Sequence, residues 1–116
     1  MISKELLSEV LDKDVISMSS YEENTLGYLV NEDDYYQINI YELAHKCKEW
    51  ILKHKTLNVS VISISCQTEP PNICHSFVSY YCFEIKDFAK ACFSGETEIE
   101  TVIHACQWIL DDEYKS

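Results

Sequence analysis

The sequence contains cysteine and histidine residues whose types and spacing could support metal binding. Cys66 lies before a Pro-Pro-Asn segment, and Cys74 and His75 follow it, so a hairpin would bring the three side chains together. Zinc binds thiolate and imidazole ligands, but the paired ligands of structural zinc sites usually lie roughly two to four residues apart, closer than Cys66 and Cys74. The three residues are therefore weak metal candidates, and the sequence predicts no metal ion and no other cofactor.

Thiol catalysis would need a cysteine with a nearby histidine base, because the thiolate is the reactive form. Cys74 adjoins His75, and Cys92 lies in an expected loop before Gly95, but no known catalytic signature surrounds either thiol. A small metal- or thiol-dependent enzyme around Cys66, Cys74 and His75 is the alternative prediction. The sequence favours a protein that is not an enzyme.

Two further His-Cys pairs, His45 with Cys47 and His104 with Cys106, fall in expected helices. Residues two apart on a helix point to different faces, so neither pair can hold one ion. Both cysteines belong to apolar stripes, and we expect them in the core with the histidines at the surface.

Acidic residues alternate with tyrosines in the first third of the chain. Tyrosine supplies a large contact area at low entropic cost, and carboxylates can occupy a surface that binds phosphates. The predicted binding residues are Tyr21, Glu22, Glu23, Tyr28, Glu32, Asp33, Asp34, Tyr35 and Tyr36. The competing interpretation is that these residues are an ordinary solvated surface.

The charge composition excludes several functions. The 116 residues carry a net charge of −11, with twenty Asp and Glu against nine Lys and no Arg. Direct nucleic-acid binding is therefore disfavoured, and a basic protein is the expected partner. Only two glycines occur, Gly27 and Gly95, so the Gly-rich phosphate loops of kinases, P-loop proteins and Rossmann folds are excluded.

The first residues contain Lys4, Glu5 and Glu9 and no apolar core of a signal peptide. No segment is long and apolar enough to span a membrane. The six cysteines then indicate reduced thiols, and we expect a cytoplasmic protein with no membrane contact.

Hydrophobic periodicity and capping residues predict the secondary structure. The segment 57–67 is rich in Val, Ile and Ser, with a break of period at Val61-Ile62 that predicts a β-bulge. Ser3 and Asn39 are the predicted N-caps of two helices, and Thr97 with Glu100 has the spacing of a capping box. The predicted elements are a helix over 3–12, a hairpin of strands over 15–20 and 25–31, a helix from about Ile40, strands over 57–67 and 77–85, and a helix over 97–111.

These elements predict an α+β fold in a single domain over residues 1–116. An N-terminal helix is followed by two β-β-α units, which form a four-stranded, mostly antiparallel sheet with helices on one face. The segments around Trp50 and Trp108 are weakly similar, and either a duplication or chance accounts for this.

Two segments, 38–50 and 94–110, resemble small uncharacterised proteins carried by bacterial phages and prophages. The shared patterns are Glu-Leu-Ala-x-Lys-Cys-Lys-Glu-Trp in the first segment and Thr-Glu-x-Glu-x-x-Ile-x-Ala-Cys-x-Trp-Ile-Leu in the second. The resemblance implies an accessory gene, and it brings no activity or catalytic residue. By analogy, small acidic proteins of this kind often bind another protein, including host-defence nucleases that they inhibit.

The leading prediction is a small acidic protein-binding module that inhibits a basic, nucleic-acid-binding host protein by mimicking nucleic acid. Beside the enzyme alternative stands a second one, a structural or self-associating protein. In that case an aromatic strand around Tyr80 and Tyr81 would pair across a two-fold axis to give a homodimer.

Overall fold

The computed structural model describes residues 2–19 and 22–115, and the side chains of all of these except 113–115. Its elements run in the order α1 (Lys4–Leu11), β1 (Ser17–Met18), β2 (Thr25–Leu29), β3 (Tyr35–Asn39), α2 (Ile40–Lys53), β4 (Val59–Glu69), β5 (Ile73–Cys82), β6 (Asp87–Gly95) and α3 (Glu98–Lys115).

The α+β class is confirmed, but the single four-stranded sheet is wrong. The strands form two separate antiparallel sheets, β1-β2-β3 (sheet A) and β4-β5-β6 (sheet B). Each predicted β-β-α unit has a third strand, so the order is β1-β2-β3-α2 and then β4-β5-β6-α3. The sheets do not join because β3 runs directly into α2, whose 14 residues carry the chain about 21 Å away.

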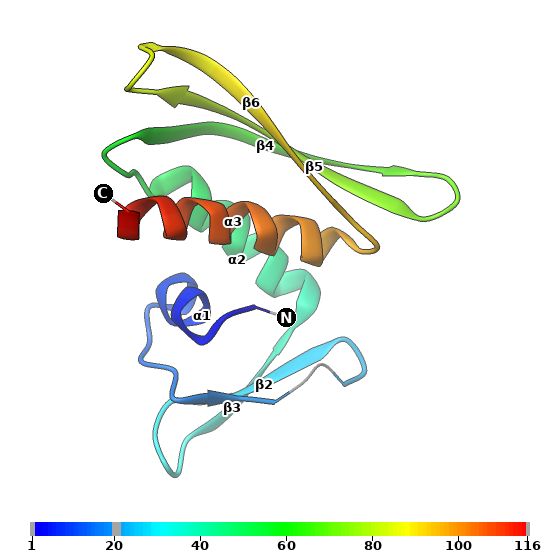
Figure 1. The fold of residues 1–116 in the computed structure, drawn as a ribbon. Helices are drawn as coiled ribbons and strands as arrows, with labels where there is room; N and C mark the ends of the chain where they lie inside the picture. The colour runs from blue at the N-terminus through cyan, green and yellow to red at the C-terminus, as the bar shows by residue number, and fades with distance from the viewer. Residues whose placement is uncertain (1, 20–21, 116) are drawn as a thin grey trace.

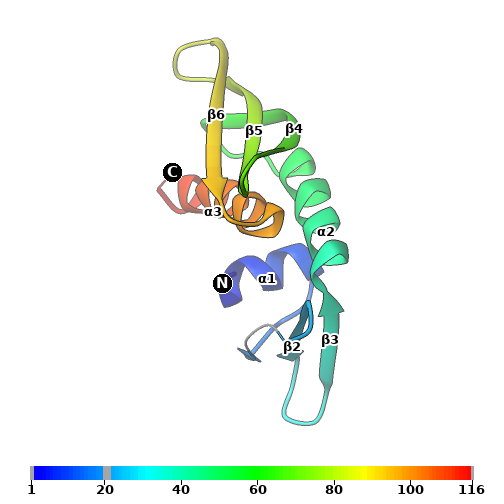
Figure 2. The same ribbon diagram turned by 90° about the vertical axis from the view of Figure 1, so that its right-hand side faces the viewer.

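Helices separate the two sheets (Figure 1). Sheet B packs on α2 and α3, α1 lies on the other side of these helices, and sheet A lies beyond α1 (Figure 2). The molecule is flat and elongated, with extents of 47 × 38 × 18 Å. No helix within residues 2–19 and 22–115 is long and apolar enough to cross a membrane.

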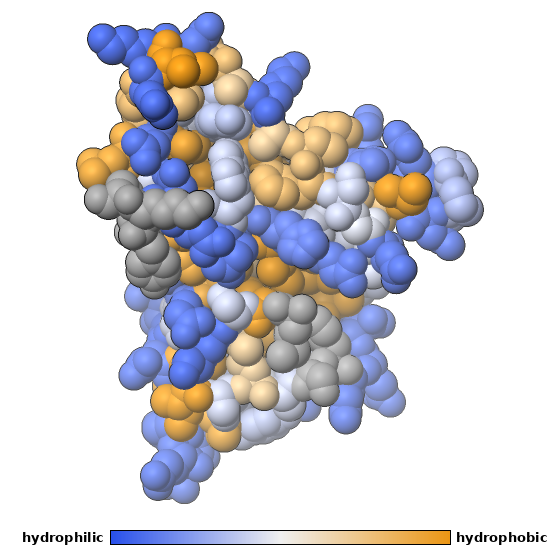
Figure 3. Space-filling model, viewed as in Figure 1, coloured by the Kyte–Doolittle hydropathy of each residue, from blue (hydrophilic) through white to orange (hydrophobic). Residues whose placement is uncertain are grey.

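All three predicted caps start their helices. At α3 the Thr97 hydroxyl accepts a hydrogen bond from the Glu100 N–H, while the Glu100 carboxylate accepts one from the Glu96 N–H and not from Thr97. The Ser3 hydroxyl accepts a hydrogen bond from the Leu6 N–H at the start of α1, and the Asn39 side chain accepts one from the Tyr41 N–H. Fully buried side chains from α1, α2 and α3, Leu6, Ile51 and Ile109 among them, then form the core between the two sheets. Figure 3 shows apolar side chains in the middle of one face and in smaller groups toward its ends, with hydrophilic side chains between them.

Sheet B has one covered and one uncovered face, because successive side chains of a strand point to opposite sides. Val59, Val61 and Val78 are buried against the helices. Val61 pairs with Tyr80 and Ser63 with Ser79, which leaves Ile62 as the extra residue and confirms the predicted bulge. The uncovered side, here called the open face, carries the alternate residues, which include Gln67, Glu69, His75, Phe77, Ser79, Tyr81, Phe88, Lys90, Cys92 and Ser94.

Candidate functional site

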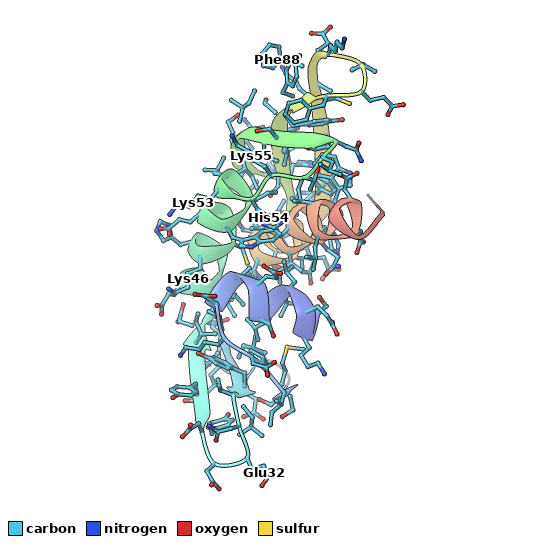
Figure 4. The ribbon with its side chains drawn as sticks, turned by 90° about the vertical axis from the view of Figure 1, so that its left-hand side faces the viewer. Glu32, Lys46, Lys53, His54, Lys55 and Phe88 are labelled. Atoms are coloured by element: carbon cyan, nitrogen blue, oxygen red, sulfur yellow. The ribbon has the colours of Figure 1, made fainter. Side chains whose placement is uncertain are left out.

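Three consecutive carboxylates, Glu32, Asp33 and Asp34, form the turn between β2 and β3 and are here called the acidic tip. All three are exposed. The Asn31 side-chain oxygen accepts hydrogen bonds from the Asp33 and Asp34 N–H groups, and its amide donates to Asp34 Oδ2. An Asn that bonds its own turn in this way fixes the loop backbone. Asn31 therefore fixes the backbone of the acidic tip and the Asp34 carboxylate. Figure 4 shows Glu32 at the end of its hairpin.

The lysines labelled in Figure 4 lie away from the acidic tip. Lys46 and Lys53 belong to α2 and Lys55 follows it, and all three lie between Glu32 at one end of the molecule and Phe88 at the other. Negative charge at the tip is thus separated from this group of positive charges, which favours an electrostatic contact between the tip and a basic surface.

The three tyrosines of the hairpin differ in accessibility. Tyr28 is only 6% exposed and stacks on Tyr36, with ring centroids 5.6 Å apart, and Lys13 Nζ lies 4.3 Å from the Tyr36 centroid. Tyr36 is 41% exposed and Tyr35 is 56% exposed. Neighbouring residues of β3 point to opposite faces of sheet A, so the two exposed rings do not form one surface. Of these three, only Tyr35 and Tyr36 can offer substantial ring area to a partner.

Tyr35 lies across Gly27 on the outer face of sheet A. A Cβ at position 27 would stand 2.8 Å from the Tyr35 Cζ atom and 2.6 Å from the Ser19 hydroxyl oxygen. Both neighbours are ends of side chains, which can move. We expect Gly27→Ala to displace the Tyr35 ring and to lower the free energy of unfolding by less than about 1 kcal/mol.

The test measures the free energy of denaturant unfolding for Gly27→Ala alone and for Gly27→Ala in a Tyr35→Ala background. There Gly27→Ala should cost less than it does alone, because only the Ser19 hydroxyl, 2.6 Å from the new Cβ, must still move and the φ angle of Gly27 is not positive. An equal loss of stability in both backgrounds would show that Tyr35 does not cover Gly27.

The other predicted acidic residues lie at the opposite end of sheet A. Glu23 and Asn24 are the two residues of the β1-β2 turn and have positive φ angles, and Glu22 and Thr25 flank them and exchange backbone hydrogen bonds. The five residues of β2, about 14 Å long, separate this turn from the acidic tip. Tyr21 lies outside the described residues. The predicted binding residues thus divide into two groups.

The structure does not bring Cys66, Cys74 and His75 together. Cys66 and Cys74 point toward the helices, where Cys66 Sγ lies 3.3 Å from the Ser76 hydroxyl oxygen and Cys74 Sγ is 3.7 Å from the Glu96 carbonyl oxygen. His75 is the next residue after Cys74 and therefore points to the open face. Among the described residues no three His, Cys, Asp or Glu side chains are placed to hold a metal ion.

The His-Cys pairs of α2 and α3 lie as expected. Cys47 and Cys106 are fully buried, and the Cys106 thiol donates to the Cys47 carbonyl oxygen at 3.3 Å. Its interaction with the Cys47 side chain, together with burial, raises the pKa of the Cys106 thiol. Cys106 therefore stays protonated and is a structural residue. His45 and His104 are exposed, and His45 pairs with Glu49.

Tyr80 and Tyr81, the proposed self-pairing segment, lie on β5. This strand is the centre of sheet B, and its backbone is already paired with β4 and β6. It offers no free edge to another strand, so pairing through β5 is wrong. Tyr80 packs edge-on against Trp108, whereas Tyr81 contacts Phe83 and Phe88. A homodimer through another surface stays a prediction.

One group of chemically active side chains comes together only in the folded structure. His75 on β5 lies beside Ser94 and Cys92 of β6 and Glu69 of β4, all on the open face. The sequence feature that points to this group is the i, i+2 spacing of Cys92 and Ser94. These two residues share a face only if residues 87–95 form a strand. The loop expected at Cys92 is wrong, because Cys92 lies in β6.

No known relative adds to this description of the candidate sites. Comparisons with protein-family models, with curated proteins and with solved structures find no significant match to this chain.

Proposed function

We propose that the protein is a non-enzymatic binding module that engages a basic partner protein through the acidic tip and the neighbouring Tyr35. The observation that carries this proposal is the exposed, Asn31-braced row of carboxylates on a hairpin that extends away from the helices. The partner we propose is a nucleic-acid-binding protein of a bacterial host, such as a defence nuclease, which the carboxylates inhibit by standing in for phosphates.

Charge and chemistry support this proposal. A net charge of −11 attracts a basic partner over a distance of about 10 Å at moderate salt. Tyr35, 56% exposed and directly after the acidic tip, adds an aromatic contact of the kind that contributes strongly to interfaces. The resemblance to phage and prophage accessory proteins gives the host protein as the class of partner, and that part of the proposal rests on analogy.

A matched pair of charge variants tests the site. Partners would be captured from a bacterial lysate on the immobilised protein at low salt, eluted with salt, identified, and purified for direct binding measurements. We expect Glu32→Gln/Asp33→Asn to weaken binding about tenfold at low salt, since each lost surface charge pair costs up to about 1 kcal/mol. An added DNA duplex should displace the partner if the carboxylates occupy its nucleic-acid site.

The control is Glu22→Gln/Glu23→Gln, which removes the same two charges at the opposite end of sheet A. We expect it to change affinity less than about twofold. Equal losses in both variants would show that overall charge, and not the acidic tip, drives binding. A captured partner whose affinity does not change with salt would exclude the electrostatic mechanism.

A further inference from the structure

His75 lies within reach of a carboxylate, a hydroxyl and a thiol that come from the two strands beside it. Its Nδ1 atom is 2.7 Å from the Ser94 hydroxyl oxygen and 4.0 Å from Cys92 Sγ, and its Nε2 atom is 3.4 Å from Glu69 Oε2. Cys92 Sγ is also 3.9 Å from the Ser94 oxygen. The Cys92 side chain is exposed, so reagents in solution can approach it.

The contacts of the ring determine what each nitrogen can do. A carboxylate only accepts hydrogen bonds, so the contact with Glu69 assigns the proton to Nε2 in the neutral ring. Nδ1 is then an acceptor, and the Ser94 hydroxyl donates to it. The Ser94 oxygen keeps lone pairs that face the Cys92 thiol. A proton can thus pass from Cys92 through the Ser94 hydroxyl to His75, while Glu69 orients the ring.

We propose that Cys92 is a site of thiol-disulfide exchange, with His75 as its general base, Ser94 as the proton relay between them and Glu69 as a positioning residue. The thiol rather than the serine is the nucleophile because a thiolate needs no oxyanion hole to react with a disulfide. Cys92 loses its proton to His75, and its sulfur attacks one sulfur of the disulfide. The S–S bond breaks, Cys92 forms a mixed disulfide, and His75 returns the proton to the leaving thiolate.

The charge of the molecule selects the kind of disulfide. The open face itself carries Glu69 and Lys90 near Cys92, but the whole chain carries −11. Anionic disulfides are therefore repelled, and cationic ones are attracted. Phe77, the register partner of Cys92, is 39% exposed and gives the carbon chain of a small disulfide an apolar surface.

The test follows modification of the reduced full-length chain by cystamine, a cationic disulfide, at pH 7. Peptide mass mapping gives a rate for each of the six cysteines, so the other five serve as internal controls. Cys92 should react first, and His75→Gln should slow it at least tenfold. Glu69→Gln, an exposed change that keeps the side-chain shape, should slow it about threefold. Replacing cystamine by neutral hydroxyethyl disulfide should slow the reaction severalfold at low salt only.

Repeating the rate measurement at about pH 9.5 shows whether His75 acts by taking the Cys92 proton or only by keeping Cys92 accessible. The titratable side chains that share the open face with His75 are Glu69, Tyr81, Lys90 and Cys92. In alkaline solution hydroxide can take the proton from a thiol, so a positioned base is no longer needed. The His75→Gln deficit should then fall below about twofold. A deficit that persists at this pH, equal rates for His75→Gln and the parent protein at pH 7, or faster reaction of another cysteine would each overturn the proposal.

Discussion

Ile51→Ala is expected to lower the free energy of unfolding by about 2–5 kcal/mol, the range for truncating a fully buried isoleucine. Ile51 is fully buried in α2, the helix that lies between sheet B and α1. The loss combines the transfer free energy of the removed carbons with the cost of the cavity left behind. Because α2 and α3 pack along each other, little rearrangement can refill that space. Denaturant unfolding with an unchanged m-value is the measurement.

Ile62→Ala is the matched control, since it makes the same chemical change at the residue of the bulge, which is 52% exposed. We expect a loss below about 1 kcal/mol. Similar losses at both positions would contradict the burial of α2 between the two layers. A normal loss at Ile51 with a second unfolding transition would instead show that sheet A unfolds apart from the remainder, against the single domain expected from the sequence.

The helices could be predicted from the sequence because their signals are local. Ser3 and Asn39 each sit one residue before a helix and bond into its first turn, and the apolar stripes that follow have helical spacing. The bulge at Ile62 was also visible, as a single break in the alternation of one strand. Each of these features depends on residues within a few positions of one another.

The two missed strands lack such a signal. β3 buries only Ile38 of its five residues, so it has no apolar alternation. In β6, Ala89, Lys90 and Ala91 are weak strand formers, and the strand is held mainly by pairing with β5. Without β3 and β6, four strands remained, and a single sheet was the simplest arrangement. Which strands share a sheet depends on contacts between distant residues, and no local pattern records it.

The candidate sites also differ in whether local sequence or long-range pairing determines them. The acidic tip was predictable because its carboxylates are consecutive, and Asn31 braces them from within the same turn. The group around His75 was not, because it needs the register in which His75 faces Ser94 across β5 and β6. The register also separates Cys74 from His75, neighbours in sequence that point to opposite faces of sheet B.

The second large effect is expected at the buried hydroxyl pair between sheet B and α3. Ser76 and Thr101 are fully buried, and their hydroxyl oxygens lie 2.6 Å apart. The Thr101 hydroxyl also donates a hydrogen bond to the Glu98 carbonyl oxygen. Besides Thr101, the Ser76 hydroxyl contacts the Cys66 thiol, which forms only weak hydrogen bonds. Thr101→Val keeps the side-chain shape but leaves the Ser76 hydroxyl without a strong partner. A buried polar group in that state costs about 1–3 kcal/mol.

A double-mutant cycle isolates this cost from other effects of the substitution. Ser76→Ala removes the stranded hydroxyl, so in that background Thr101→Val should cost at least about 1 kcal/mol less than it does alone. Thr68→Val, the same change at an exposed position of β4, is the control and should stay within about 0.5 kcal/mol. Additive losses in the cycle would mean that the two hydroxyls do not bond each other. In that case α3 is held on sheet B by apolar contacts, such as those of Trp108 with Tyr80 and Phe93, and not by a polar link.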